Sequence, residues 1–450
     1  MQSIQYRGPM PASNPQGEMT EGARSVGNRF GEARQRLGEG ARRDLVAIAV
    51  VALAVVTVTV LSTVLLPVRA KSPDLLVGRP WWEGWVNWDS GWYRQIALYG
   101  YDYTPGRQGP VAFFPLYPML MRVGRSLVGS VTGSGVVVTL ASGVAAAVLV
   151  ARWFRERLSP DAAWTALLLF LLYPYSFYLF GPLYADALFL LAVIGSFTAL
   201  ERGHPWLAGL IGAAATASRP LGVVLVVGLV VRTLERRGVF GGRLARPVGQ
   251  TPPRTPAERG GGGRPPDQTG EPSQAAPRWQ ERLARLRPGD CGVLLAAAGA
   301  AGYAFYLWHR FGDPLAFLTI QKAWGQEEGP VTWFKVDFFR EMARFESVNA
   351  CVVLAANAAV TLVAVALLPR VVRRFGWGYG TFTILIVALS GLSTKNFTGM
   401  GRYLLAAFPC FAVAGELLAE RVRLRGWVLA CSGVGLLAAA SLFARAYYLS

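Results

Sequence analysis

The chain has 450 residues, of which 53% are hydrophobic and only 16% are charged, and its formal net charge is +18. A soluble protein of this length would carry more charge, so the composition predicts a membrane protein. The four cysteines and two histidines form no spaced set typical of a zinc site or a disulfide framework. No nucleic-acid recognition motif accompanies the positive charge, which is better explained by arginine-rich segments on the cytoplasmic side of a membrane.

The N-terminal segment 1–44 is polar and rich in Gly and Arg, and we predict a disordered cytoplasmic tail there. The apolar run Leu45–Val68 follows it, long enough to cross a hydrocarbon core of ~30 Å. No short apolar core with a small-residue cleavage site lies near the N-terminus, as a signal peptide would require. We therefore expect Leu45–Val68 to be a retained transmembrane helix.

Further apolar runs predict more membrane spans, and one of them, Trp206–Val231, is long for a single upright span. Pro220 interrupts it near the middle, where proline removes a helix hydrogen bond. If it crosses twice, as two short helices meeting near Ser218–Pro220, every arginine-dense segment falls on the cytoplasmic side. The chain then makes about 11 crossings, with the N-terminus inside. The other predicted spans are Ser134–Ala151, Ala162–Phe180, Leu183–Leu200, Cys291–His309, Asn349–Leu368, Trp377–Thr394, Tyr403–Leu418 and Trp427–Ala446.

This topology divides the chain into two membrane modules. The first, 45–231, contains an outer loop at 69–133, within which Ala112–Gly124 is typical of an amphipathic helix in the membrane interface. Segment 232–290 is rich in Gly, Pro and polar residues and predicts a disordered cytoplasmic linker. The second module, 291–450, contains an outer loop at 310–348.

Polar residues of several distant segments converge on the predicted outer face. Because the topology rests on the inner loops, this convergence is an independent indication of a functional site. The residues are Asp89, Asp186, Arg219, Lys322, Lys395 and Arg402.

Asp89 is the acid at the centre of this prediction, in the aromatic stretch "WVNWDSGWYRQIALYGY". It could act as a general base, because an aromatic setting raises a carboxyl pKa. It could equally be the N-cap of the following helix, with its aromatic neighbours forming an interfacial belt. The two roles are compatible.

The other charged candidates also have two interpretations each. Asp186 begins a membrane span, where an acid is costly unless it is paired, so it is either functional or a structural partner of Arg219. Arg219 and Arg402 suit phosphate binding through bidentate donors, but a side chain that snorkels near a span end is the alternative. Lys322 and Trp324 either contact substrate or rest on the membrane surface.

No metal site is indicated. His204 and His309 fall on opposite faces in this topology, and the outer loops contain no D-x-D pattern that would clamp a sugar nucleotide through a metal.

Several blocks together resemble the PIG-V-like mannosyltransferases. In chain order they are "NWDSGWYRQIALYGY", "AFFPLYPML", "YPYSFYLFGPLYADALFLL", "ASRPLG", "GDPLAFLTIQKAWG" and "GRYLLAAFP". The resemblance runs from about Trp82 to Pro409 and implies the GT-C glycosyltransferase architecture, with the active site on the non-cytoplasmic face. It also implies a polyprenyl-phosphate sugar donor, inversion at the anomeric carbon, and an acid of the first outer loop as catalytic base.

On this chain that base is Asp89. Relatives often carry a His three residues later, where this chain has Trp92, and the family's Tyr-small-acid pattern maps to Tyr184 and Asp186. Arg219 and Arg402 are then the expected phosphate ligands. We expect Trp88, Trp92 and Tyr93 to contact the sugar or line the lipid entrance.

The sequence therefore predicts a multi-pass plasma-membrane hexosyltransferase, most simply a polyprenyl-phosphate-mannose-dependent mannosyltransferase without a cofactor. Its expected partners are membrane lipids, the lipid-linked donor, and a glycan, glycolipid or protein acceptor. A transporter or flippase of lipid-linked sugars is the first alternative, although the chain shows no internal repeat and its charges gather on one face. A membrane scaffold comes third, since it would not need these acids and arginines.

Overall fold

The computed structural model describes residues 15–68, 80–240, 283–324, 329–345 and 347–449, without the side chains of 15–37, 322, 324 and 349. The chain divides into two units, Met1–Ala47 and Ile48–Ser450. All secondary-structure elements in the described ranges are helices, which confirms the predicted all-α class. Lys322 and Trp324 belong to the 3₁₀ helix η7 (Ile320–Trp324), but their side chains lie outside the described parts of the chain.

The first helix, α1, covers Pro15–Leu65 and so begins well before Leu45, where the first span was expected to start. The segment from Pro15 onward therefore differs from the predicted disordered tail. Besides its glycines, it contains Arg, Glu, Ala and Gln, which are good helix formers. Extending an existing helix costs far less than nucleating a new one, so the apolar span can propagate into the preceding polar residues.

Within the described residues, five helices are long and apolar enough to cross a membrane, and a sixth span results if Met400–Ala406 and Phe408–Ala419, bent by 86°, count as one. The chain is therefore a multi-pass membrane protein, while the count of 11 crossings stays a prediction. Shorter apolar helices account for the difference: α5 (Pro160–Leu172) has 13 residues and spans only about 20 Å. The five long segments are Gly38–Leu65, Val131–Arg155, Pro288–Phe311, Ala350–Phe375 and Val422–Ala444.

The predicted break within Trp206–Val231 is confirmed. Helix α7 (Pro205–Thr216) and helix α8 (Val223–Arg236) are separated by a turn and the short 3₁₀ helix η4 (Pro220–Gly222). Arg219, which precedes the proline, is extended at φ −155° and ψ 149°, as proline requires of its predecessor. A Cβ on Gly222 would lie 2.6 Å from the backbone of Ala215, so the chain can fold back this closely only with glycine there.

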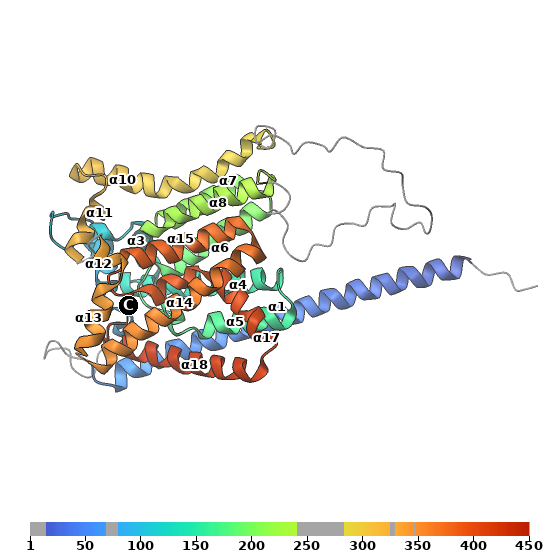
Figure 1. Ribbon diagram of the computed structural model, residues 1–450, viewed down its shortest axis with the longest axis horizontal. Coiled ribbons are helices and arrows are strands. Elements are labelled where there is room, and N and C mark those ends of the chain that lie inside the picture. The colour runs from blue at the N-terminus through green and yellow to red at the C-terminus, as the bar shows by residue number, and fades with distance from the viewer. Residues whose placement is uncertain (1–14, 69–79, 241–282, 325–328, 346, 450) are drawn as a thin grey trace, which may run out of the picture. The chain divides into compact units, whose positions relative to one another are not determined.

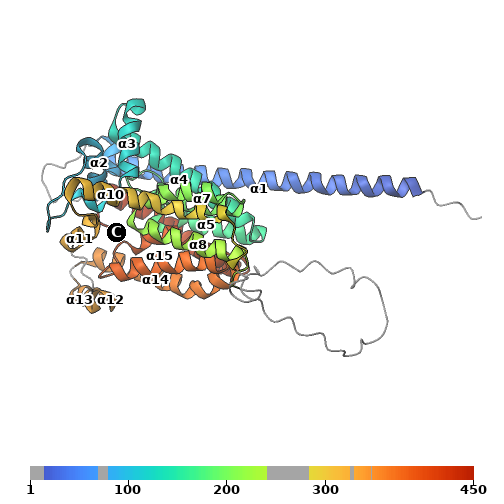
Figure 2. The ribbon, with the colours of Figure 1, turned by 90° about the horizontal axis from the view of Figure 1, so that it is seen from above.

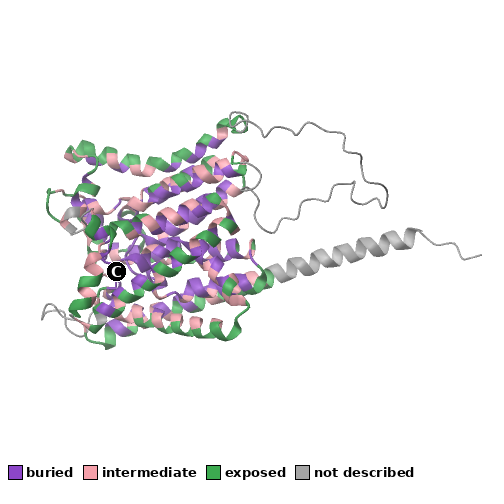
Figure 3. Ribbon diagram, viewed as in Figure 1, coloured by how far each residue is buried: buried purple, intermediate pink, exposed green. Residues whose placement is uncertain are grey.

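The interior of the bundle is built around α6 (Asp186–Glu201), a largely buried helix that contacts α4 (Val131–Arg155) and α7. Figures 1 and 2 show the long helices running side by side, and Figure 3 shows that their buried residues face inward. The remaining long or core helices are η3 (Pro174–Leu179), η6 (Pro288–Ala297), α10 (Ala298–Phe311), α14 (Val348–Phe375), α15 (Trp377–Ser393), α17 (Phe408–Ala419) and α18 (Val422–Ala444).

Short helices from the two predicted outer loops gather at one end of the bundle, at the left of Figures 1 and 2. Among them, α3 (Leu116–Val128) occupies most of Ala112–Gly124, the stretch predicted as an amphipathic helix. It buries Tyr117 and Met121 and exposes Arg125 and Leu127. These elements are η1 (Trp81–Trp85), α2 (Ser90–Tyr99), η2 (Pro110–Ala112), α3 (Leu116–Val128), α11 (Ala316–Thr319), α12 (Pro330–Trp333) and α13 (Val336–Arg344).

The linker between α8 and η6 is shorter at both ends than the predicted segment 232–290. Helix α8 continues to Arg236, and η6 begins at Pro288; residues 241–282 lie outside the described ranges. Helix α14 likewise continues past the expected span end at Leu368, through Pro369, to Phe375.

Candidate active site

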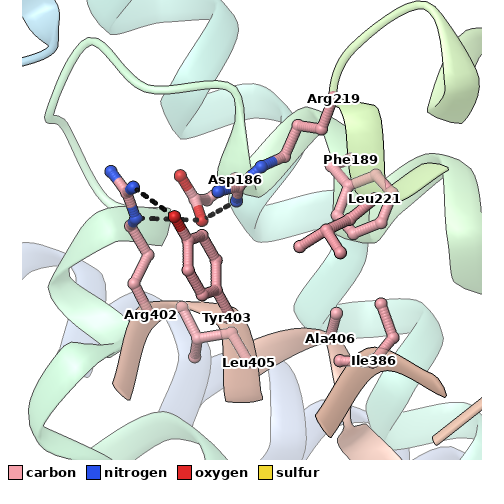
Figure 4. A pocket seen from close by; sticks show the side chains of 9 residues that line it. All are labelled: Asp186, Phe189, Arg219, Leu221, Ile386, Arg402, Tyr403, Leu405 and Ala406. Carbon is pink, nitrogen blue, oxygen red and sulfur yellow. Dashed lines mark hydrogen bonds and ion pairs between the residues drawn. The ribbon is translucent and has the colours of Figure 1, made fainter. Parts of the chain in front are cut away.

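Four of the predicted outer-face residues form an alternating chain of acids and arginines. Arg402 Nη1 donates a hydrogen bond to Asp89 Oδ2 at 2.9 Å, and Arg402 Nε lies 3.9 Å from Asp186 Oδ1. Arg219 Nη1 donates to the same Asp186 oxygen. Figure 4 shows Arg219 and Arg402 approaching Asp186 from opposite sides. Because the four residues come from four separate segments, tertiary packing alone assembles this chain.

Asp89 occupies the N-cap position of α2, but its side chain makes no capping hydrogen bond. Its carboxylate instead faces Arg402 and keeps 27% of its surface exposed. The backbone N–H of Asp89 donates to the Tyr184 hydroxyl at 3.2 Å, and that hydroxyl donates to the Asn87 carbonyl at 3.4 Å. The Asp89 side chain therefore does not cap α2, and its role as a catalytic base stays a prediction.

Trp88, directly before Asp89, has a left-handed backbone with φ of 57°. A bulky residue pays on the order of 1–3 kcal/mol for this conformation, which persists only where the surroundings impose it. Here the Trp88 indole N–H donates to the Tyr447 carbonyl at 3.2 Å, and its ring packs edge-on against Tyr448 with centroids 4.8 Å apart. The strained turn fixes the direction of the Asp89 side chain.

Asp186 is the first residue of α6, as expected from the sequence, and only 5% of its surface is exposed. The helix N-terminus adds a partial positive charge that favours the carboxylate. Before it, Gly181 has φ of 142°, and a Cβ at this position would collide with the Trp85 indole. The pairing of Asp186 with Arg219, given as the structural alternative, is present, and Arg402 adds a second cation.

Tyr403 was not among the predicted site residues, and it lies between the two arginines. The guanidinium carbon of Arg219 lies 5.0 Å from its ring centroid and that of Arg402 lies 5.2 Å from it. Arg402 also packs over Tyr184 at 4.9 Å and Tyr178 at 5.6 Å. Such cation–π contacts stabilise buried guanidinium groups. The only sequence signal for Tyr403 was its position next to Arg402 in "GRYLL".

Arg402 retains an unused donor. Its Nε is buried and has no hydrogen-bond partner among the described residues, at a cost on the order of 1–3 kcal/mol. The adjoining cavity of about 10 Å³ has room for roughly one water molecule. Any larger ligand therefore requires the lining side chains to move. The lining residues are Asp186, Phe189, Arg219, Leu221, Ile386, Arg402, Tyr403, Leu405 and Ala406.

The three aromatic residues that were expected to contact sugar differ from one another in exposure. Tyr93 is 6% exposed, packs against Tyr117 with centroids 5.1 Å apart, and has its pKa raised by burial. Trp92 is half-buried and stacks on Phe113 at 6.1 Å. Trp88 is 40% exposed. Tyr93 is thus a packing residue of the site and is not exposed to a sugar. Sugar contacts by Trp88 and Trp92 stay a prediction.

No group of three or more His, Cys, Asp or Glu side chains in the described ranges lies close enough to hold a metal ion. The expectation of a centre without a metal stays a prediction.

Comparison with known proteins supports the sequence resemblance. Residues 45–240 match the model of the mannosyltransferase (PIG-V) family. No curated protein sequence matches significantly.

Among solved structures, the chain is similar to ArnT from Cupriavidus metallidurans bound to undecaprenyl phosphate, with 16% identity and a TM-score of 0.45, over 85% of this chain and 61% of that one. It is also similar to the Archaeoglobus fulgidus oligosaccharyltransferase in the apo form, with 13% identity and a TM-score of 0.43. A third similar structure is the archaeal oligosaccharyltransferase AglB of that organism with an inhibitory peptide and a dolichol-phosphate, with 12% identity and a TM-score of 0.42. The chain spans only 56% of each of these last two, and 89% of it is covered in both comparisons.

The family match includes Asp89, Asp186 and Arg219 and ends before Arg402. The resemblance to the PIG-V-like mannosyltransferases is therefore confirmed over residues 45–240 of this chain.

Proposed function

We propose that the protein is a membrane glycosyltransferase that moves a mannosyl group from a polyprenyl-phosphate donor to an acceptor hydroxyl. The observation that carries this proposal is the partly exposed Asp89 carboxylate bonded to a buried arginine, Arg402, at 2.9 Å. A base beside a fixed cation is the pair of groups that this reaction needs, because a proton leaves the acceptor while negative charge grows on the leaving phosphate.

In the proposed reaction, Asp89 takes the proton of the acceptor hydroxyl as its oxygen attacks the anomeric carbon. The bond between that carbon and the phosphate oxygen breaks, and the polyprenyl phosphate leaves with the electron pair. A single displacement of this kind inverts the configuration at the anomeric carbon.

Arg402 would change partners during this cycle. While it is bonded to Asp89, it occupies a carboxylate oxygen that would otherwise take the proton. A donor phosphate can accept two parallel N–H bonds from a guanidinium, and the unused Nε of Arg402 supplies the second one. Arg219 would stay paired with Asp186 and hold the second side of the phosphate site. Donor binding would then release Asp89 Oδ2, so that both carboxylate oxygens become available to the acceptor hydroxyl.

The distribution of arginines supports an extracytoplasmic site. Asp186 and Glu201 mark the two ends of α6, which are about 22 Å apart at 1.5 Å per residue. Arg157 and Arg232 pair with Glu201, at the end opposite to Asp89. Because arginine-rich ends stay in the cytoplasm, the end that carries Asp89 would face outward.

The test uses the purified full-length chain in lipid nanodiscs, with radiolabelled polyprenyl-phosphate-mannose and a membrane extract as the source of acceptor. We expect a labelled product from the wild type and from the matched control Asp337→Asn, whose carboxylate pairs with Arg340 at 3.4 Å on α13. Asp89→Asn should make almost none. Near wild-type transfer by Asp89→Asn would overturn the base assignment.

The same assay addresses the metal and the alternative function. Because arginines supply the positive charge, transfer should be unchanged by a chelator; loss of transfer that added Mg²⁺ or Mn²⁺ restores would contradict a metal-free centre. If labelled donor instead crosses a sealed proteoliposome membrane and no acceptor is labelled, the protein is a transporter of lipid-linked sugars.

A further inference from the structure

A second and much larger cavity lies at the same end of the bundle. Its volume is about 270 Å³, against about 10 Å³ for the cavity beside Arg402. Pockets for drug-sized ligands are roughly 300–1,000 Å³, so this one suits a single sugar ring or a small headgroup rather than a prenyl chain. Its described lining residues are Val68, Trp82, Glu83, Val86, Asn87, Arg94, Thr132 and Ala446.

The lining combines opposite charges with neutral polar groups and one large aromatic ring. Glu83 and Arg94 balance each other in charge, which disfavours a lone anion such as a phosphate. The Asn87 amide oxygen adds an acceptor, and the Thr132 hydroxyl adds a group that can both donate and accept hydrogen bonds. The Trp82 indole is 43% exposed and is held edge-on against Trp81 with centroids 5.5 Å apart. A neutral polyhydroxyl molecule with an apolar C–H face satisfies all of these groups together.

The wall of this cavity is built into the turn that carries the base. The Asn87 side-chain amide donates to the carbonyls of Gly84 at 3.2 Å and Phe443 at 2.9 Å, which anchors the turn to the C-terminal helix. The Tyr184 hydroxyl then bonds both the Asn87 carbonyl and the Asp89 N–H. The cavity and Asp89 are therefore fixed relative to each other through two residues of one turn.

We propose that this cavity binds a neutral sugar unit of the acceptor, and so positions the acceptor hydroxyl for Asp89. This inference rests on the proposed glycosyltransferase function, and it names the acceptor as a saccharide. It also assigns a binding role to Trp82, Glu83 and Arg94, which take no part in the proposed transfer reaction.

Sugar binding is tested without any turnover by saturation-transfer difference NMR. The full-length chain, in nanodiscs rather than in a sugar-headed detergent, is mixed with methyl α-mannopyranoside, methyl α-glucopyranoside or methyl α-galactopyranoside. We expect at least one hexoside to bind to the wild type and to Asp89→Asn. Trp82→Ala and Arg94→Ala should bind it roughly tenfold more weakly, having lost an aromatic face or a charged hydrogen bond.

Two matched controls separate this effect from a general loss of structure. Trp427→Ala removes another exposed tryptophan, which is 74% exposed, and Arg125→Ala removes an exposed arginine of α3. Both should bind the hexoside like the wild type. If no hexoside binds, or if the cavity variants bind as well as the controls do, the proposal is overturned. Binding of phosphoethanolamine that only the cavity variants lose, without hexoside binding, would identify a lipid-headgroup site and would also overturn it.

Failure of the proposed function gives a different result. Hydrolysis of labelled polyprenyl-phosphate-mannose, with water as acceptor, depends on the base but not on this cavity. Hydrolysis that Asp89→Asn loses and Trp82→Ala retains, with unchanged hexoside binding, would reject the cavity and keep the enzyme. Hexoside binding that depends on the cavity, without hydrolysis or transfer, would reject the enzyme and keep the cavity.

Discussion

The two ends of α6 carry buried clusters of the same residue types, but the clusters are built differently. At the C-terminal end, Glu201 Oε1 accepts hydrogen bonds from Arg232 Nη2 at 2.8 Å and from the Tyr379 hydroxyl at 2.9 Å, while Oε2 pairs with Arg157. Arg232 also bonds Glu235 at 2.8 Å. Each charge in this cluster has partners on several helices.

At the N-terminal end the network is open. Arg402 reaches Asp89 through one nitrogen and leaves Nε without a hydrogen bond among the described residues. Asp89 keeps a quarter of its side chain exposed. Buried polar networks stabilise a fold when all members are satisfied, whereas an unsatisfied member costs stability and calls for an explanation, such as a catalytic role or a bound water. Under the proposed function, the Glu201 end holds the helices together and the Asp186 end serves the reaction.

The largest expected effect is the loss of activity in Asp89→Asn. Removing a positioned base lowers the rate by about 10²–10⁴-fold. Because the Asp89 side chain is partly exposed and Asp186 still lies 3.9 Å from Arg402, the thermal midpoint should fall only modestly. Sugar transfer and thermal unfolding are both measured on the nanodisc protein. Strong destabilisation of Asp89→Asn would show that the Asp186 end of α6 is structural as well, so that the two ends would not differ in role.

The opposite result is expected for Glu201→Gln. This change removes the mostly buried carboxylate that Arg157 and Arg232 share and leaves each arginine with one acidic partner fewer, which costs about 3 kcal/mol of stability. Activity per folded molecule should stay within about twofold, because the site is about 22 Å away. Thermal unfolding and transfer rates check this. A large loss of specific activity in Glu201→Gln without destabilisation would show that the Glu201 end is not purely structural.

Arg402→Lys tests whether Arg402 binds the donor phosphate through two parallel hydrogen bonds. Lysine keeps the charge but cannot form two parallel bonds to a phosphate. We expect transfer to fall by roughly 30-fold, about 2 kcal/mol, with most of the loss in the KM for the donor. Arg374→Lys, at a residue paired with Glu416 at 2.8 Å, is the matched control. An unchanged donor KM in Arg402→Lys would argue against partner exchange with the phosphate.

Tyr184→Phe removes the hydroxyl beneath Asp89 and nothing else. The Asp89 N–H and the Asn87 carbonyl then lose a partner, so we expect kcat to fall about fivefold while donor KM is kept. Tyr379→Phe, which removes a hydroxyl from the Glu201 cluster, should lower stability instead. Equal effects of both variants on kcat would remove the distinction between the two ends.

The smallest expected effect on activity concerns α15, which is capped by charged side chains at both termini. Glu235 accepts from the N–H groups of Trp377 at 2.8 Å and Gly378 at 3.2 Å, and Lys335 Nζ donates to the carbonyls of Gly391 and Thr394. Burial lowers the pKa of Lys335 from 10.5 to about 8.

Because the folded pKa is the lower one, the unfolded chain binds more protons between about pH 8 and 10.5, and stability rises with pH there. The thermal midpoint of the wild type should therefore rise across that window, and Lys335→Met should lose this rise. Identical pH profiles of the thermal midpoint for the two proteins would show that folding does not lower the pKa of Lys335.

Local sequence features determined the class of the protein and the end at which the site lies. Hydropathy sets the helices, Pro220 sets the break at Arg219, and the distribution of arginine predicts which ends of the helices share a side. These are properties of short segments, so Asp89, Asp186, Arg219 and Arg402 could be assigned to one face from their own segments alone.

Tertiary packing alone decided how these residues pair. Asp89 and Arg402 are 313 positions apart, and Asp89 could have capped α2 if Arg402 were not beside it. The burial of Tyr93 and the unsatisfied Nε of Arg402 depend in the same way on helices that are distant in the chain. A charge in a low-dielectric interior takes the partner that packing brings within reach, and no local pattern specifies that partner.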